Sequence, residues 1–157
     1  MQLRDSPEEA AFREGAASAM GVALPRKPCT ISENGLVRVV WVGPDDWFIV
    51  GPSGQPEAIA LRLREALSGM HHAVTDVSSG YTVLHLSGRP VRDVLAQGCP
   101  LDLHPRAFRP GMAVTTTLAR VPLILWQVRP DAYRLLPRSS FADYVARWLV
   151  DAMQEFA

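Results

Sequence analysis

The sequence predicts an α+β fold with two pseudo-symmetric strand–strand–helix units, an antiparallel sheet and helices packed on one side of it. Three observations lead to this class. Short runs rich in Val, Ile, Leu and Trp alternate with turn residues, helical apolar periodicity follows the strand pairs, and one strand–strand–helix segment recurs near the C-terminus. With 157 residues and 48% hydrophobic content, the chain can bury a core of this kind.

Residues 1–35 are expected to form an N-terminal helix and a connecting loop. Ser6–Glu9 has the composition of a capping box with proline in the first turn, and Gly21 is expected to end the helix. Residues 22–34 contain two prolines and predict a loop with a short edge strand. The helix has only a thin apolar stripe, so it should dock on the body of the protein rather than form its core. The stripe consists of Phe12, Ala16 and Met20.

Residues 36–157 are expected to form a single compact domain. Residues 36–42 and 47–50 are rich in β-branched and aromatic side chains, and the turn composition of Gly43–Asp46 between them predicts an antiparallel hairpin. Apolar residues then recur with helical periodicity over residues 56–67, which predicts an amphipathic helix.

The middle of the chain is expected to hold a second strand pair and a short helix. Residues 73–77 and 81–87 flank Ser78–Gly80, whose composition is typical of a tight turn between strands. Residues 89–97 predict a short helix, and residues 99–105 predict a loop that two prolines make rigid.

Three further strands and a long helix are expected at the C-terminal end. Apolar residues between Phe141 and Phe156 keep helical spacing throughout, and Ser140 with Asp143 matches a capping box at the start of this helix. The strands are expected at residues 112–118, 121–128 and 133–136.

The strand–strand–helix pattern of residues 36–68 recurs at about residues 121–157. Pro44–Val50 aligns without a gap on Pro130–Leu136, at an offset of 86 residues, and the match continues through the helix that follows. Two long copies imply a pseudo-symmetric pair whose apolar faces bury each other, because a solenoid needs at least three short repeats.

The composition disfavours several classes of function. Sixteen basic and sixteen acidic residues give a net charge of zero, so no general field attracts nucleic acid or a membrane surface. Lys27 is the single lysine, which disfavours Schiff-base catalysis and P-loop phosphate binding. Cys29 and Cys99 lie far apart, and the N-terminal segment lacks the apolar region of a signal peptide. Both features indicate a cytoplasmic protein.

No catalytic, cofactor-binding or metal-binding residues are expected in this chain. The four histidines lack metal-ligand spacing, and neither a nucleophile elbow nor a glycine-rich phosphate loop occurs in the sequence. Asp102 and His104 are the one acid–base pair that an independent enzyme could use, but no nucleophile or cofactor loop accompanies them.

An arginine-rich region extends from Arg89 to Arg138, with eight arginines and three acidic residues. Arginine suits carboxylate and phosphate recognition and is enriched at protein interfaces, although a solvated face can have the same composition. With few aromatic residues and no net charge, the chain favours a partner-binding surface here over an RNA-binding one. The interface candidates are Arg89, Arg92, Arg106, Arg109, Asp102 and His104.

Six segments spread along the chain carry a resemblance to one protein family. They are Leu24-Pro25, Trp41–Trp47, Asp76–Ser78, Leu86–Gly88 followed by Arg92–Leu95, Cys99–His104, and Arg138–Ala142. In this order they resemble the gamma subunit of heterotetrameric sarcosine oxidase. The Cys-Pro-Leu-Asp-Leu-His loop and the Gly-Pro-Asp-x-Trp run are the most specific of these segments, and the resemblance covers nearly the whole chain.

The resemblance implies a non-catalytic structural gamma subunit in a cytoplasmic complex with alpha, beta and delta chains. Such a complex converts sarcosine, tetrahydrofolate and oxygen into glycine, 5,10-methylenetetrahydrofolate and hydrogen peroxide. FAD, FMN, NAD, zinc and tetrahydrofolate are expected in the partner subunits, and none of them is expected to be bound by this chain alone. The resemblance also implies a fold like the folate-binding domain of aminomethyltransferase, the glycine-cleavage T-protein.

The sequence departs from the folate-binding relatives at one signature, and this departure bears on a second possible function. Those relatives carry a Lys-Gly-Cys-Tyr-x-Gly-Gln-Glu type of signature, whereas the nearest segment here is Gln97–Pro100, with no glutamate after it. The alternative is a stand-alone folate-binding or anion-binding protein of the same fold, in which the arginines would hold a glutamate-tailed ligand. The missing signature disfavours this alternative, because a shared fold does not carry a binding site with it.

Overall fold

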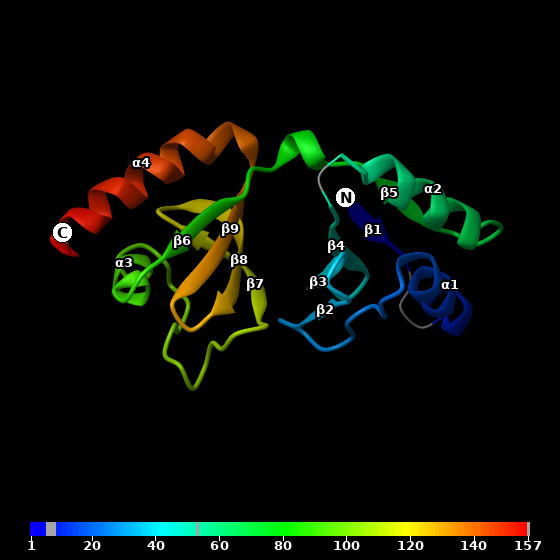
Figure 1. Cartoon of the computed structure of the whole chain (residues 1–157), viewed down its shortest axis with the longest axis horizontal. Helices are drawn as coiled ribbons and strands as arrows, with labels where there is room; N and C mark the ends of the chain where they lie inside the picture. Colours follow the sequence, from blue (N-terminus) through cyan, green and yellow to red (C-terminus); the bar gives the residue numbers. More distant parts are fainter. Residues whose placement is uncertain (6–8, 53, 157) are drawn as a thin grey trace. The chain divides into compact units, whose positions relative to one another are not determined.

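The computed structural model describes residues 1–5, 9–52 and 54–156, and it divides the chain into two compact units, Met1–Ser78 and Ser79–Ala157 (Figure 1). Each unit holds one antiparallel sheet with helices on one face, so the predicted α+β class with antiparallel strands is confirmed, whereas the strands form two sheets and not the one expected. Among the described residues, no helix is both long and apolar enough to cross a membrane.

The division into units differs from the predicted boundary after residue 35. Strand β1 (Gln2–Arg4) pairs with β4 (Asp46–Val50) on one side and with β5 (Ala73–Thr75) on the other, so it lies inside the first sheet. Helix α1 (Ala10–Met20) contributes to the core beneath the same sheet. The N-terminal segment therefore belongs to the first unit, and the remainder of the chain is shared between the two units.

The first sheet has the strand order β2-β3-β4-β1-β5, and every neighbouring pair is antiparallel. Strand β2 (Ile31–Glu33) is the short edge strand expected after the N-terminal helix. Strands β3 (Arg38–Gly43) and β4 form the predicted hairpin, with Trp41 opposite Trp47. Because side chains alternate across a strand, this register directs Val39 and Ile49 to the same face of the sheet.

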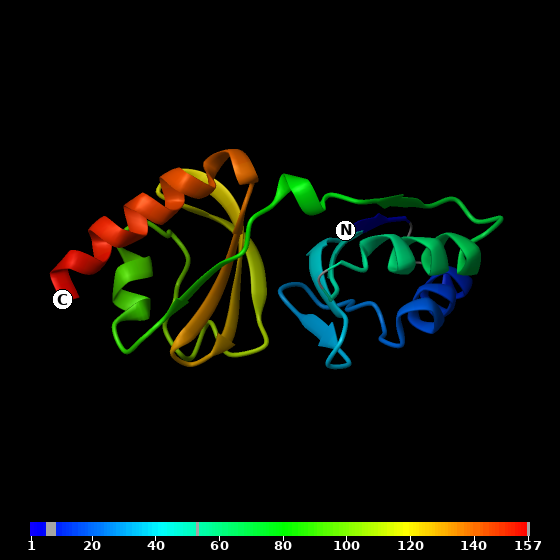
Figure 2. The same ribbon diagram turned by 45° about the horizontal axis from the view of Figure 1, so that its top comes forward.

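Helices α1 and α2 (Pro56–Ala66) lie on that face of the first sheet (Figure 2). Helix α1 ends as predicted at Gly21, whose φ of 68° is left-handed and whose N–H donates to the carbonyl of Ala17 at 2.8 Å. The expected start of this helix falls mostly on residues 6–8, outside the described residues. The described helix begins at Ala10, with Glu9 in the N-cap position.

The apolar stripe of α1 forms part of the core, and the expectation that it would only dock on the body is wrong. Phe12 and Ala16 have no exposed surface, and the Phe12 ring centroid lies 5.9 Å from that of Trp47. A thin stripe is sufficient here because α2 covers the rest of the same sheet face. The cluster includes Phe12, Ala16 and Met20 of α1, Ile59, Ala60 and Leu63 of α2, and Leu3, Val39, Trp47 and Ile49 of the sheet.

The second unit contains one sheet of four strands, in the order β6-β9-β8-β7, with two helices on one side (Figures 1 and 2). Its core joins apolar residues of both helices with Leu123, Leu125 and Leu135 of the sheet. In chain order the elements are β6 (Leu84–Ser87), α3 (Val91–Ala96), β7 (Ala113–Leu118), β8 (Val121–Arg129), β9 (Ala132–Pro137) and α4 (Ala142–Met153).

The predicted strand pair around Ser78–Gly80 does not form a hairpin. Strand β5 pairs with β1 in the first sheet, whereas β6 pairs with β9 in the second, and Ser78–Gly80 is a short 3-10 helix between them. Each strand pairs where it completes a sheet over an apolar core, as Leu86 does opposite Tyr133. The segment Ser78–Gly80, which has the composition of a tight turn, therefore lies at the boundary between the two units and not inside a hairpin.

The predicted Ser140–Asp143 capping box is also absent. A 3-10 turn, Ser139–Phe141, precedes α4, so its last residue takes the N-cap position, and no side chain donates or accepts a capping hydrogen bond there. Asp143 instead pairs with Arg147 one turn further on, with 2.9 Å between Oδ2 and Nε. The tightening of the chain before the helix moves Ser140 out of capping position.

The two units share one topology. Each contains the order β-α-β-β-β-α, and the strand order β2-β3-β4-β1 of the first sheet corresponds to β7-β8-β9-β6 of the second. The β-bulge between Trp41 and Gly43 corresponds to the bulge between Gln127 and Arg129, at the same offset of 86 residues as in the sequence alignment. The repeat thus extends beyond the strand–strand–helix segment to the β-α-β elements that precede it.

Candidate functional site

The second unit has a cavity of about 460 Å³ between α3 and the loop of residues 99–105. Helix α3 buries Val91, Val94 and Leu95 in the core, and this orientation directs Arg92 to the side of the loop. The polar side chains that line the cavity are Arg92, Asp93, Asp102 and His104, and the apolar ones include Ala96, Leu101 and Pro105. We call this cavity the Arg92 pocket.

Arg92 connects the helix to the loop. Its guanidinium donates a hydrogen bond to the backbone carbonyl of Leu103, and its Cζ atom lies 5.8 Å from the centroid of the Tyr133 ring. Tyr133 comes from β9, is almost fully buried, and stacks on Phe108 with 6.3 Å between ring centroids. Arg92 is therefore held between a loop carbonyl and a buried aromatic surface, which restricts its side chain.

The loop has its own hydrogen bonds. One carboxylate oxygen of Asp102 accepts from the backbone N–H of His104 at 2.9 Å, and Nδ1 of His104 accepts from the backbone N–H of Arg106 at 3.2 Å. The carbonyl of His104 accepts from the backbone N–H groups of Ala107 and Phe108 at 2.8 and 2.9 Å. Because Nδ1 accepts a backbone hydrogen bond, the proton of the neutral imidazole lies on Nε2.

The electrostatic environment of Tyr133 reflects its burial beside an arginine. Burial raises the pKa of the Tyr133 hydroxyl above its ordinary value, and the nearby Arg92 guanidinium acts in the opposite direction. The hydroxyl oxygen is buried and has no hydrogen-bond partner among the described residues. The Arg92 guanidinium, which lies beside this buried ring, is therefore partly desolvated.

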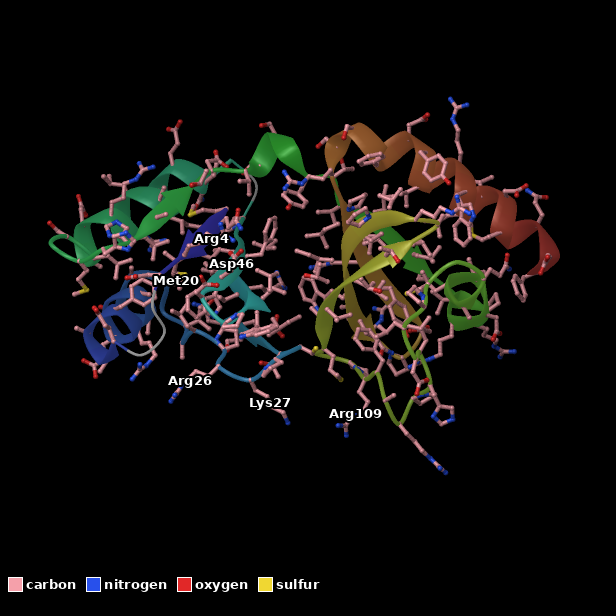
Figure 3. All side chains as sticks on the ribbon, turned by 180° about the vertical axis from the view of Figure 1, so that it is seen from behind. Arg4, Met20, Arg26, Lys27, Asp46 and Arg109 are labelled. Carbon is pink, nitrogen blue, oxygen red and sulfur yellow. The ribbon has the colours of Figure 1, made fainter. Side chains whose placement is uncertain are left out.

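The structure brings together three of the six predicted interface residues. Arg92, Asp102 and His104 line the Arg92 pocket, whereas Arg89, Arg106 and Arg109 are exposed and do not line it. Figure 3 shows the Arg109 side chain on the loop that leads to β7. Asp93 and the apolar rim of the pocket are not among the predicted interface residues, although the Arg-Asp step and the proline-bounded loop are visible in the sequence.

Two other arginines of the same region lie against aromatic rings. Arg134 lies 4.6 Å above the centroid of Trp126, its cross-strand neighbour, and Arg138 lies 4.9 Å above that of Tyr81. Such cation–π contacts stabilise the sheet and its flank. Part of the arginine excess therefore has a structural role within the second unit.

A smaller cavity of about 270 Å³ lies in the first unit, between the end of β4 and the start of α2. Met1 is one of the residues that line it, and the Met1 ammonium donates to the carbonyl of Ile49 at 3.0 Å. Burial lowers the pKa of this ammonium, and Asp76 acts in the opposite direction. The pKa of Asp76 is itself lowered, because the hydroxyl and N–H of Ser78 donate to its carboxylate. The other residues that line this cavity are mostly apolar or glycine, so the cavity offers few groups for chemistry.

The Asp46 carboxylate has a structural role in the first unit. Asp46 accepts hydrogen bonds from Gln2 at 3.0 and 2.7 Å and pairs with Nε of Arg4 at 3.1 Å, which joins β1 to β4 (Figure 3). Within residues 1–5, 9–52 and 54–156, no three His, Cys, Asp or Glu side chains gather as ligands of a metal ion would.

Comparison with known proteins supports the resemblance found in the sequence. The sarcosine oxidase, gamma subunit family matches residues 4–155. The sarcosine oxidase subunit gamma of Corynebacterium sp. (strain P-1) is 41% identical over 143 residues, which cover 90% of this chain and 69% of that protein. The protein of the same description from Arthrobacter sp. is 39% identical over 142 residues, with 90% and 69% covered.

A solved structure gives the same result. A chain of the structure described as heterotetrameric sarcosine oxidase from Corynebacterium sp. U-96 in complex with pyrrole 2-carboxylate superposes with a TM-score of 0.93 and 36% identity. The superposition covers 99% of this chain and 78% of that chain. The match extends over almost all of the sequence, and the identity exceeds the level at which a fold alone would be shared. The chain therefore belongs to the gamma subunit family of sarcosine oxidase.

Proposed function

We propose that this chain is a non-catalytic structural subunit of a heterotetrameric sarcosine oxidase and that it stabilises the large, flavin-bearing subunits by packing against them. Membership of the gamma subunit family is the observation that carries this proposal. The complex would oxidise sarcosine and transfer its methyl carbon to tetrahydrofolate, with glycine and hydrogen peroxide as further products. Its FAD, FMN, NAD, zinc and tetrahydrofolate would be held by alpha, beta and delta chains in the cytoplasm.

The surface of the second unit supports a role in subunit contact. Helix α4 and its flanks carry large apolar side chains that are between 37% and 55% exposed, and the arginine-rich region lies in the same unit. Aromatic residues, methionine and arginine are the side chains enriched at protein interfaces. The exposed apolar residues are Phe141, Tyr144, Val150, Met153 and Phe156.

The repeated topology supports a fold related to the folate-binding domain of aminomethyltransferase. That relationship does not by itself include folate binding, because a binding site depends on particular side chains and not on the fold. The segment Gln97–Pro100 lacks the glutamate that follows in the folate-binding signature. We therefore place tetrahydrofolate with the partner subunits in this proposal.

Reconstitution with and without this chain tests the proposed function. The alpha, beta and delta chains are produced with and without it, and the assembled mass, the flavin absorbance per complex and the rate of hydrogen peroxide formation from sarcosine are measured. We expect smaller assemblies, lower flavin content and lower turnover when the chain is omitted. Unchanged values of all three would overturn the proposal. Calorimetry of the isolated chain with tetrahydrofolate tests the alternative, and we expect no heat of binding at millimolar ligand.

A further inference from the structure

We propose that the Arg92 pocket receives the carboxylate of a single aspartate or glutamate side chain that projects from a partner subunit. This inference rests on the proposed function and adds to it the chemistry of one contact. It is carried by the cavity itself, by the two hydrogen-bond donors among the side chains that line it and by the exposure of its rim.

Arg92 supplies the charged donor. One of its terminal nitrogens donates to the carbonyl of Leu103, and no carboxylate of the described residues lies within 4.0 Å of its guanidinium. The guanidinium has five N–H donors in a planar fork that matches a carboxylate, so several remain available after the loop contact. A half-buried, restricted arginine loses little side-chain entropy when it forms such a pair.

His104 supplies the neutral donor. Its Nδ1 accepts from the backbone N–H of Arg106, so the Nε2–H of the neutral ring is the donor that remains for a ligand in the pocket that this side chain lines. The contact also fixes the ring against the loop, which in turn is anchored to α3 through Arg92. A charged fork and a neutral N–H on two connected elements suit one carboxylate group.

The rim indicates a side chain of a protein rather than a free small molecule. Asp93, Ala96, Asp102, His104 and Pro105 line the pocket and are all exposed, so the pocket is shallow. Sites for small molecules usually enclose most of the ligand surface, and a shallow pocket does not. A side chain that projects from a flat partner surface would be covered by the partner itself, and the exclusion of water strengthens the ion pair.

The two acidic residues of the lining define the kind of segment that fits. Asp93 and Asp102 would repel a run of several acidic residues, because like charges in contact cost free energy at an interface. One carboxylate in a neutral or basic segment pairs with Arg92 and meets this repulsion only once, whereas each further acidic residue adds repulsion without a second arginine in the lining to pair with. We therefore commit to a single acidic side chain, and not to an acidic stretch, as the occupant.

Affinity measurements on the reconstituted complex provide the first test. Arg92→Gln should weaken the association of this chain with the partner subunits about 30-fold or more, as expected for loss of one member of a desolvated ion pair. Arg120→Gln is the matched control, because Arg120 is exposed in the same region, is not among the predicted interface residues and does not line the pocket, and it should change the affinity less than about threefold. The unfolding midpoint of each isolated variant shows whether the fold is retained.

His104 gives a second pair of variants in case Arg92→Gln disturbs the loop. Asparagine can keep an acceptor near the position of Nδ1 but has no group at the position of Nε2, whereas glutamine can place a donor there. We expect His104→Asn to weaken subunit association about fivefold to tenfold and His104→Gln to weaken it less. Equal effects of the two variants would contradict the donor role of Nε2.

Cross-linking identifies the occupant directly. Lys27 is the single lysine of the chain, so the double variant Lys27→Arg, Arg92→Lys carries its one side-chain amine in the pocket. Zero-length carbodiimide coupling of the complex should then join position 92 to one aspartate or glutamate of a partner subunit, as identified by mass spectrometry. The control is Lys27→Arg, Arg120→Lys, which should give little of that product.

The outcomes separate this inference from the proposed function. Association of the wild-type chain with no cross-link from position 92, and an affinity of Arg92→Gln within threefold of wild type, would overturn the pocket contact and leave the subunit role intact. Failure of the wild-type chain to associate would overturn both. Binding of acetate to the isolated chain that Arg92→Gln abolishes, with unchanged subunit affinity, would also overturn the inference and would identify a site for free carboxylates.

Discussion

Replacement of Gly98 by alanine has two opposing effects on stability, a gain from the lower entropy of the unfolded chain and a loss from steric overlap in the folded protein. Gly98 follows α3, and its φ is not in the left-handed range, so alanine is compatible with its backbone. Replacement of such a glycine by alanine ordinarily stabilises a protein by about 0.4–1 kcal/mol, because the unfolded chain loses freedom. A Cβ at position 98, however, would lie 2.6 and 2.8 Å from two ring atoms of Trp148 and 3.2 Å from the backbone nitrogen of Ala119.

The steric effect should exceed the entropic one. The Trp148 ring is rigid and packs against the core of the second unit, and the backbone nitrogen of Ala119 donates to the carbonyl of Gly98 at 3.0 Å, so neither neighbour moves freely. Overpacking of this kind costs about 1–3 kcal/mol. We therefore expect Gly98→Ala to lower the free energy of unfolding by roughly 1–2 kcal/mol, measured by urea denaturation with far-ultraviolet circular dichroism.

Two comparisons make this prediction specific. Gly80→Ala is the matched control, because nothing lies within 4 Å of a Cβ there and its φ is also compatible, so it should be neutral or stabilising. In a Trp148→Leu background, Gly98→Ala should cost less than about 0.5 kcal/mol, since the ring that it meets is gone. An equal cost of Gly98→Ala in both backgrounds would refute the steric reasoning.

Further expectations concern buried polar groups. The midpoint of the Tyr133 absorbance titration, taken as the difference between wild type and Tyr133→Phe, should lie above the ordinary pKa of tyrosine. The midpoint should be higher still in the Arg92→Gln variant, because the nearby positive charge is gone. A midpoint at or below the ordinary value would contradict the burial argument. Because the folded-state pKa is the higher one, the stability that Tyr133 contributes should be fully present below pH 10 and decrease above it, as urea denaturation at several pH values would record. Asp46→Ala should cost about 1–3 kcal/mol of unfolding free energy because it removes the part-buried hydrogen bonds from Gln2 and Arg4 of β1 to β4. The exposed pair of Asp143 is the control, and Asp143→Ala should cost less than about 0.5 kcal/mol; similar costs at both positions would show that burial does not set the difference.

Much of the local structure could be predicted because it depends on residues that are close in sequence. The hairpin around Gly43–Asp46, the end of α1 at Gly21 and the amphipathic α2 all follow from turn chemistry or periodicity. The repeat at an offset of 86 residues aligned strands and helices that the structure pairs in equivalent registers. It was also possible to predict from the sequence that Arg92, Asp102 and His104 lie in one region, because α3 and the loop are neighbours in sequence.

What the sequence could not show depends on contacts between distant residues. Whether Phe12 lies in the core or at its edge depends on how much of the sheet face α2 covers. The pairing of β5 could not be predicted from nearby residues, because its partner β1 lies about seventy residues earlier in the chain. The aromatic surface beneath Arg92 comes from Tyr133 on another strand. Short-range patterns thus determined the elements, the family and half of the candidate site, whereas the division into units and the surroundings of Arg92 were decided by the tertiary structure, because burial is a property of the assembled layers and not of any single segment.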